Sequence, residues 1–364
     1  MKISDREILI WLNSIGLNNK IINKIKSHFG KLCEFWEAEN DEINKIDGLL
    51  DEVKEKILIN KKIENMEKLF YRLDRLKIDT ITIYDENYPA SLRNIYDYPN
   101  VLYVKGQILE EDNLALGIVG SRKATAYGKW AAEKFTKELV ELGVTIVSGL
   151  AAGIDTIAHK TAVNAGGRTI GILGNGIDVV YPKKNLSLYG EIMENGAIIS
   201  EFPLGIPPLP YNFPQRNRII SGLSLGVIVI EAQEKSGSLI TAHHALEQGK
   251  EVFALPGNIN SIYSGGTNKL IKDGAIPLLD IEDIIEEVYE LREKQKSKKV
   301  DSIDYSNLSE TEIKVLELLK EGPLYIDIIA YRIGSDISTI NSVLTILELK
   351  GIINELPGKL FTIC

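Results

Sequence analysis

The sequence predicts an α/β protein built around a doubly wound parallel sheet, with a smaller, mainly helical domain before it and another after it. Between residues 114 and 279, short apolar runs alternate with amphipathic helical segments without a break. The strand-like runs are apolar on both faces, which is typical of a parallel sheet that helices cover on both sides. Glycine or another small residue follows most of these runs, as expected where a strand turns into a helix.

The length and periodicity of each run predict the individual elements. Short apolar runs are typical of buried strands, and we expect strands at 114–119, 144–148, 169–173, 197–200, 227–231, 251–255 and 276–279. Apolar residues three and four positions apart predict helices at 127–142, 154–165, 184–195, 215–223, 239–248 and 268–272. Two earlier runs, 81–84 and 101–104, are expected to extend the same sheet.

Residues 1–75 are expected to form a helical domain of the helix-hairpin-helix or SAM-like type. Gly16 and Gly30 bracket a stretch with apolar residues at helical spacing, and "INKIDGLLDEVKEKI" repeats that pattern. Residues 1–110 carry a net charge of -2. Contact with DNA and a structural or protein-binding role are therefore both open for this domain.

The remaining chain divides into the sheet domain at 76–292, a charged linker at 293–304 and a winged-helix domain at 305–364. The last segment has the pattern of three helices followed by a two-stranded hairpin. A DNA-reading winged helix usually carries basic residues on its third helix. Here the helix expected at 337–350 has only Lys350, and residues 280–364 carry a net charge of -7. We therefore expect this domain to contact proteins or to regulate.

The composition excludes several classes of protein. No apolar run reaches the roughly 20 residues that a bilayer-spanning helix needs, and the first residues lack a signal-peptide pattern. Cys33 and Cys364 are too few and too far apart for a disulfide framework or a zinc site. We therefore expect a cytoplasmic protein with no membrane contact, no metal and no cofactor. The overall charge of -9 does not exclude a nucleic-acid partner, because residues 111–279 are neutral and a local basic site acts through its own field.

The loops at the carboxyl ends of the strands predict an anion site. In a parallel sheet these loops meet at one edge, where helix N-termini offer free N–H groups and a partial positive charge. Small or basic residues occupy four of the first five loops, and none of these loops offers paired acids. The candidates are Gly120, Ser121, Arg122, Ser148, Gly149, Gly174, Lys183, Arg216, Asn217 and Arg218. Each taken alone is equally consistent with a turn, a solvated surface or a structural ion pair.

The pattern indicates what kind of anion the site binds. A dinucleotide site would have an acidic residue at the end of the second strand, but that strand ends in "VTIVSG". A G-x-x-x-x-G-K-[ST] phosphate loop is also absent. Aromatic residues that can stack on nucleic-acid bases are interleaved with the basic ones: Tyr127, Tyr181, Tyr211, Phe213 and Tyr263. Burial between loop and sheet is the alternative interpretation for some of these aromatic residues.

Six stretches carry a resemblance to a known family. They are "GIVGSRKATAYG", "SGLAAGIDTIAHKTA", "GILGNGIDVVYPKKN", "FPQRNRIISGLS", "SGSLITAHHALEQGKEVFALPG" and "SGGTNKLIKDGA". In this order they are similar to the DprA/Smf family, the DNA processing protein A of bacterial transformation, and they cover about half of the chain. The flanking helical and winged-helix domains also match a common layout of that family.

The resemblance implies an extended Rossmann-like domain that binds single-stranded DNA without sequence specificity. It further implies a protein that is not an enzyme, that loads RecA onto DNA during natural transformation and recombination, and that helps displace single-strand-binding protein. A homodimer through the Rossmann-like domain is also implied, with an interface near "NKLIKDGA". By motif, Gly120, Ser121 and Arg122 would grip backbone phosphate and Lys183 would be a second anchor. The same pocket would be lined by Arg216, Asn217 and Arg218.

Two other functions stay open at this point. Nucleotide phosphoribohydrolases of the same broad fold superfamily also have glycine-rich strand ends, together with a P-G-G-x-G-T-x-x-E motif that carries a catalytic glutamate. The corresponding loop here, "EAQEKSGSLITAHHA", lacks that acid at the helix start, so Glu231 would have to substitute. The second alternative is a scaffold for partner proteins whose pocket has lost its ligand.

Overall fold

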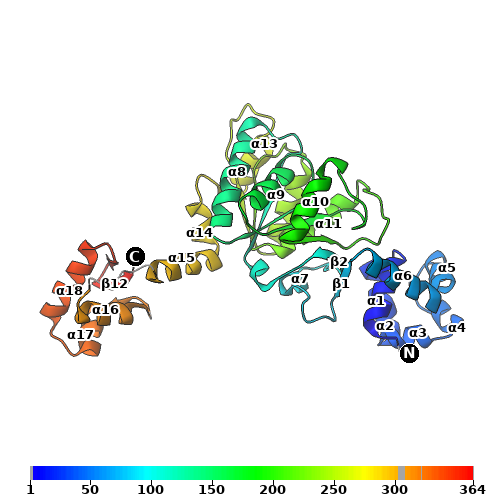
Figure 1. Cartoon of the computed structure of the whole chain (residues 1–364), viewed down its shortest axis with the longest axis horizontal. Coiled ribbons are helices and arrows are strands. Elements are labelled where there is room, and N and C mark those ends of the chain that lie inside the picture. Colours follow the sequence, from blue (N-terminus) through cyan, green and yellow to red (C-terminus); the bar gives the residue numbers. More distant parts are fainter. Residues whose placement is uncertain (1–2, 302–307, 321, 364) are drawn as a thin grey trace. The chain divides into compact units, whose positions relative to one another are not determined.

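The computed structural model describes residues 3–301, 308–320 and 322–363 (Figure 1). The chain divides into two compact units, Met1–Ile284 and Ile285–Cys364. The first unit holds the helical N-terminus and the large sheet, and the second holds the winged helix, so each unit is described by itself.

A mixed sheet forms the centre of the first unit, with the described strands in the order β1-β2-β6-β5-β4-β3-β7-β8-β9. Strands β3 to β9 run parallel, as the doubly wound pattern predicts. The two earlier runs do extend the sheet at its β6 edge, but β2 pairs antiparallel with both of its neighbours, β6 and β1. The strands are Asp79–Thr82, Val101–Gly106, Ala115–Val119, Thr145–Ser148, Thr169–Leu173, Gly196–Ser200, Gly226–Val229, Glu251–Ala254 and Ile276–Pro277.

Helices cover both faces of this sheet. Helices α8, α9 and α10 pack in succession on one face, while α11 and α12 pack against each other on the opposite face. Strands β3 to β7 are buried along their whole length because they are covered on both sides. The helices of this domain are α7 Ala90–Arg93, α8 Ala126–Glu141, α9 Ile154–Asn164, α10 Leu186–Glu194, α11 Asn212–Leu223, α12 Gly237–Glu247, α13 Gly265–Lys272 and α14 Glu282–Glu287.

Most element boundaries agree with the sequence prediction, and the largest difference lies at α11. This helix begins at Asn212, three residues before the predicted start, and contains Pro214 in its first turn. Proline is tolerated there because the first backbone N–H groups of a helix have no partner within the helix. The earlier start brings Phe213 onto the helix, next to the predicted site.

The N-terminal part is helical, as predicted, and packs on the β1–β2 side of the sheet domain. Its helices are α1 Asp5–Ser14, α2 Asn19–Phe29, α3 Leu32–Glu37, α4 Asn40–Asn44, α5 Asp51–Asn60 and α6 Ile63–Arg75. Trp11 and Phe35 are buried in its core. Several contacts join it to the sheet domain; for example, Arg6 Nε lies 2.8 Å from Asp85 Oδ1, and Tyr103 donates to Asn13 Oδ1 at 2.8 Å.

The second unit ends in a winged helix, which confirms the prediction for this part of the chain. Helices α16 Glu310–Lys320, α17 Ile326–Ile333 and α18 Ile337–Leu349 enclose its core together with the strands β10 Leu324–Tyr325, β11 Ile353–Leu356 and β12 Leu360–Ile363. The expected two-stranded hairpin gains a third strand, because β10 pairs with β12. Most of the predicted linker belongs to helix α15, Tyr289–Asp301, and its last three residues lie outside the described residues.

No helix in the described part of the chain combines the length and apolar character needed to cross a membrane.

Candidate functional site

The predicted anion site is an open cavity of about 470 Å³ at the carboxyl ends of β3 and β7. These neighbouring strands lead into helices on opposite faces of the sheet, so the cavity lies at the topological switch point, where ligands of such folds bind. Its walls are the loop after β3, the first turn of α11 and the start of α12. Five predicted residues line it: Gly120, Ser121, Arg122, Arg216 and Asn217.

Arg122 is an exposed cation of this cavity, and its neighbour Lys123 is a second one. Its guanidinium lies 5.5 Å from the centre of the Phe213 ring, and no carboxylate among the described residues forms an ion pair with it. Ser121 Oγ accepts a hydrogen bond from the Lys123 N–H at 3.1 Å, which shapes the loop. Gly120 lets α9 approach, since a Cβ there would lie 2.7 Å from Ile154. The loop thus presents a planar fork that can bind phosphate through two hydrogen bonds.

Arg216 forms the floor of the cavity and is only 3% exposed. Its guanidinium donates to the carbonyl oxygens of Gly149, at 2.7 Å, and Ile172. Burial lowers the pKa of Arg216 to about 10, and nearby Asp155 partly offsets this effect. Burial also raises the pKa of Asp155. Arg216 is thus a buried cation beside Asp155 at the bottom of the cavity, whereas Arg122 can contact a ligand directly.

Asn217 joins two walls of the cavity. Its side-chain nitrogen donates to the Gly237 carbonyl at 3.1 Å, and its oxygen accepts from Arg216 Nε at 3.3 Å. The first contact holds α11 against the N-terminus of α12, an eleven-residue helix that begins with Gly237 at the cavity wall. Such a helix end favours anions.

Gly149 and Gly174 lie in a smaller cavity of about 60 Å³ that adjoins the first. A Cβ on Gly149 would lie 2.5 Å from Arg216 Nη2, and one on Gly174 would lie 2.8 Å from the Phe213 ring. The two glycines therefore make room for protein side chains of the site.

Lys183 and Ser148 are placed differently from the pocket residues. Lys183 is exposed in the short helix η2, Lys183–Asn185, and lines neither cavity, although Tyr181 and Pro182 just before it line the smaller one. Ser148 is fully buried, and its hydroxyl donates to the Ile118 carbonyl at 2.6 Å. The expectation that Ser148 contacts the ligand is wrong for this geometry, because its side chain connects two strands.

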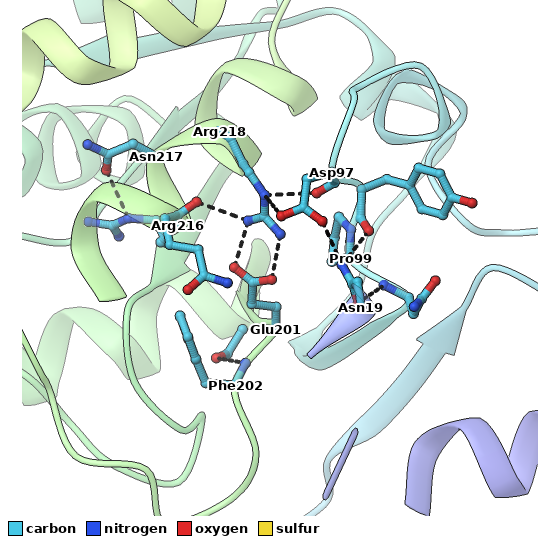
Figure 2. Close-up of polar contacts among 12 residues, drawn as sticks. Asn19, Asp97, Pro99, Glu201, Phe202, Arg216, Asn217 and Arg218 are labelled. Atoms are coloured by element: carbon cyan, nitrogen blue, oxygen red, sulfur yellow. Dashed lines mark hydrogen bonds and ion pairs between the residues drawn. The ribbon is translucent and has the colours of Figure 1, made fainter. Parts of the chain in front are cut away.

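Arg218 is the clearest departure from the sequence prediction, because it points away from the cavity (Figure 2). Its two terminal nitrogens lie 2.6 and 2.7 Å from the carboxylate oxygens of Glu201, and its Nε donates to the Asp97 carbonyl at 2.8 Å. The Arg218 and Glu201 side chains are 7% and 8% exposed. Arg218 is thus the buried centre of an ion pair on the side of α11 that faces Asn19 of the N-terminal domain.

Hydroxyl groups at the start of α12 also line the cavity, although the sequence did not lead us to predict them. Ser236, Ser238 and Thr241 line the cavity, and the two serine hydroxyls lie 2.7 Å apart. The small residues of "SGSLITAHH" were the available signal, since they mark a helix start at the same edge of the sheet. Phe213 also proves central, because both Arg122 and Arg216 lie within about 6 Å of its ring centre, a cation–π distance.

Glu231 is held by the loop that precedes α8. Its carboxylate accepts hydrogen bonds from the Thr125 N–H at 3.0 Å and from the Thr125 hydroxyl at 2.5 Å, and the residue is 3% exposed. A Cβ on Gly128 would collide with it. Within the described residues, no group of three or more His, Cys, Asp or Glu side chains could hold a metal ion.

Two family models and several known proteins match this chain. The family model for DNA recombination-mediator protein A matches residues 79–289, and the model for the DprA winged helix domain matches residues 304–359. Protein Smf of Synechocystis is 33% identical over 389 aligned positions, covering 96% of both chains. Protein Smf of Escherichia coli is 42% identical over 277 positions, covering 75% of this chain and 74% of its own.

Solved structures agree with these sequence matches. DNA processing protein A of Streptococcus pneumoniae superimposes with a TM-score of 0.67 at 37% identity, covering 79% of this chain and 99% of its own. DNA processing protein A of Helicobacter pylori, whose structure concerns its mode of binding single-stranded DNA, gives a TM-score of 0.53 at 34% identity, covering 58% of this chain and 94% of its own. The chain therefore belongs to the DprA/Smf family of DNA-processing, recombination-mediator proteins.

Proposed function

We propose that this protein binds single-stranded DNA at the cavity beside Arg122, without sequence specificity. The observation that carries the proposal is the exposed guanidinium of Arg122, which has no ion-pair partner in the described residues and lies over an aromatic ring. A cation that grips phosphate next to a ring that stacks on a base is the combination found in sequence-tolerant single-strand binding. The related protein of Helicobacter pylori, described as binding single-stranded DNA, supports this assignment.

Each part of the cavity has a role in this proposal. Arg122 and the N-terminus of α12 would bind backbone phosphate, with Lys183 as an outer anchor. Phe213 and Tyr181, whose ring centres are 5.8 Å apart, would offer faces for bases. Every base has a π-face, whereas base identity is read by hydrogen bonds to its edges. A site built from these parts would accept any sequence.

We further propose that the protein acts in the cytoplasm as a mediator that loads RecA onto the bound strand and helps displace single-strand-binding protein. The family membership supports this role, as it supports a homodimer through the Rossmann-like domain. We also propose that the protein is not an enzyme. The engagement of Glu231 with Thr125 supports this, because the carboxylate that would have to act in nucleotide hydrolysis already serves the loop before α8.

Fluorescence anisotropy of a labelled oligo-dT across a salt series tests the DNA site. For the wild type we expect log Kd to rise linearly with log salt, by about 0.7 per phosphate contact. The Arg122→Ala variant should bind oligo-dT more weakly, and its slope should be smaller by about 0.7, the contribution of one phosphate contact. Arg75→Ala is the matched control, because it removes an exposed guanidinium 5.9 Å from the Tyr71 ring centre, away from the cavity.

The same assay separates the alternatives. If Arg122→Ala and Arg75→Ala lose the same oligo-dT affinity, or if neither loses any, the DNA binds elsewhere on the protein. A flat salt dependence would favour a partner scaffold over phosphate binding. Hydrolysis of nucleoside monophosphates at high protein concentration would instead establish the enzymatic alternative. If only Arg122→Ala loses oligo-dT affinity, the next measurement is RecA filament formation on DNA coated with single-strand-binding protein.

A further inference from the structure

A second cavity, of about 380 Å³, lies where the N-terminal helices meet the sheet domain. We call it the seam pocket and define it by Asn13, Asn18, Tyr211, Asn212 and Gln215. The first two belong to the end of α1 and the turn before α2, and the other three to the beginning of α11. We propose that the seam pocket binds a nucleobase of the same DNA strand, an inference that rests on the proposed function.

Carboxamide groups set the chemistry of the seam pocket. Asn212 is only 3% exposed, and its side-chain nitrogen has no hydrogen-bond partner in the described part of the chain. A buried donor without an acceptor is costly, which points to an acceptor that arrives with a ligand. Carboxamides match the paired donors and acceptors on the edges of bases. Gln215, which is exposed, offers a second such group on the same turn.

The charges around the seam pocket favour a neutral ring over a phosphate. Asp97 and Glu201 line the pocket, but Arg218 binds both of them (Figure 2). Arg218 offsets only one of these two negative charges, and Lys20 is the only cationic side chain among the lining residues. Phosphate would have to approach two carboxylates without a dedicated arginine. A base avoids this cost because it carries no charge.

Tyr211 connects the seam pocket with the first cavity. It is the N-cap residue of α11, 68% of it is exposed, and it lines the seam pocket. Pro210, immediately before it, lines the cavity of Arg122. A strand that leaves Arg122 and crosses Pro210 therefore meets the Tyr211 ring next. The ring can stack on a base whose edge then faces Asn212 and Gln215.

Binding of long and short oligonucleotides tests this inference. Stacking on one aromatic ring contributes about 1–3 kcal/mol, which is about 5- to 150-fold in Kd. We expect Tyr211→Ala to weaken binding of an oligo-dT of about 16 nucleotides by such a factor, and binding of one of about 4 nucleotides much less. Tyr211→Phe should keep the affinity. The matched control is Tyr71→Ala, because Tyr71 is 65% exposed and lines neither cavity.

Asn212→Leu gives an independent measurement. Because its amide nitrogen has no partner, an apolar side chain of similar size should not lower the free energy of unfolding. It should still weaken binding of the long oligonucleotide. Photo-crosslinking with a single 5-iododeoxyuridine in oligo-dT should label Tyr211 in the wild type.

The outcomes distinguish this inference from the proposed function. If Arg122→Ala loses DNA while Tyr211→Ala binds the long oligonucleotide as tightly as Tyr71→Ala, the seam pocket is not a base site and the proposed function stands. If the wild type does not bind oligo-dT, both proposals fail. Greater loss on the long than on the short oligonucleotide, together with the Tyr211 crosslink, supports the base site.

Discussion

Replacing Arg218 with alanine should destabilise the fold without removing a DNA contact. The guanidinium makes two short hydrogen bonds to Glu201 and further bonds to the carbonyl oxygens of Asp97 and Gln215, and its side chain is 7% exposed. Its removal leaves the Glu201 carboxylate buried without a cation. Breaking a buried ion pair on one side costs about 3–5 kcal/mol. We expect a loss of that size in the free energy of unfolding of the first unit.

Urea unfolding followed by circular dichroism measures this cost, and oligo-dT anisotropy under conditions where the variant is folded measures the effect on DNA. We expect the salt slope of binding to stay at the wild-type value, because Arg218 does not line the cavity. The double variant Arg218→Met with Glu201→Leu is the control. It removes both charges, and such replacements of buried pairs are often neutral or stabilising.

One pattern of results would refute this reasoning. If Arg218→Ala unfolds at the same urea concentration as the wild type but loses salt-dependent DNA binding, the side chain contacts phosphate and the ion pair contributes little. If the double variant is as unstable as the single one, the cost does not come from the charge left on Glu201.

Two further predictions concern the support of the site. Burial lowers the pKa of His159 from 6.5 to about 3. Between these two pH values the unfolded chain binds more protons than the folded one, so the free energy of unfolding should fall by about 5 kcal/mol as the pH drops through that range. His159→Gln should flatten this pH dependence, as measured by urea unfolding. Gly153 has a φ of 86°, and an added Cβ would lie 2.2 Å from the Ser121 carbonyl oxygen. Gly153→Ala should therefore lower the free energy of unfolding by about 2–3 kcal/mol, as measured by thermal unfolding. The same variant should bind oligo-dT more weakly.

The sheet and the location of the site could be predicted from the sequence because both depend on local patterns. Continuous apolar strands and helical spacing fix the alternation of elements, and parallel strands bring their carboxyl ends to one edge. Gly120, Ser121 and Arg122 could be assigned to that edge for this reason alone. The antiparallel pairing of β2 with β1 and β6 could not be predicted, since a short apolar run looks the same in either direction.

The role of a glycine or serine at the edge depends on what lies across from it, which the sequence does not show. Arg216 fills the space beside Gly149, and Phe213 fills the space beside Gly174. Both neighbours come from α11, which is distant in the sequence, so the local sequence around each glycine does not reveal them. Ser148 is the last residue of β4, and its hydroxyl bonds to a neighbouring strand. These three roles follow from tertiary packing alone.

Helical geometry explains why the three residues of "RNR" do different things. Successive residues of an α-helix are about 100° apart, so positions two apart do not face the same side. Once α11 is recognised as a helix that already includes these residues, Arg216 and Arg218 must diverge. Arg216 reaches the floor of the first cavity, Asn217 reaches the start of α12, and Arg218 reaches Glu201 near the N-terminal domain.

Residues of α11 line both cavities, so this helix lies between them. Its first turn holds Tyr211 and Asn212 at the seam pocket and Phe213 at the cavity of Arg122. The ion pair of Arg218 fixes the same helix against the segment that carries Asp97, which Asn19 of the N-terminal domain also contacts at 3.2 Å. A change in how the N-terminal helices pack would thus reach both proposed DNA contacts through one rigid element. The N-terminal domain would in this way influence DNA binding through α11, without a direct contact between its own basic residues and the strand.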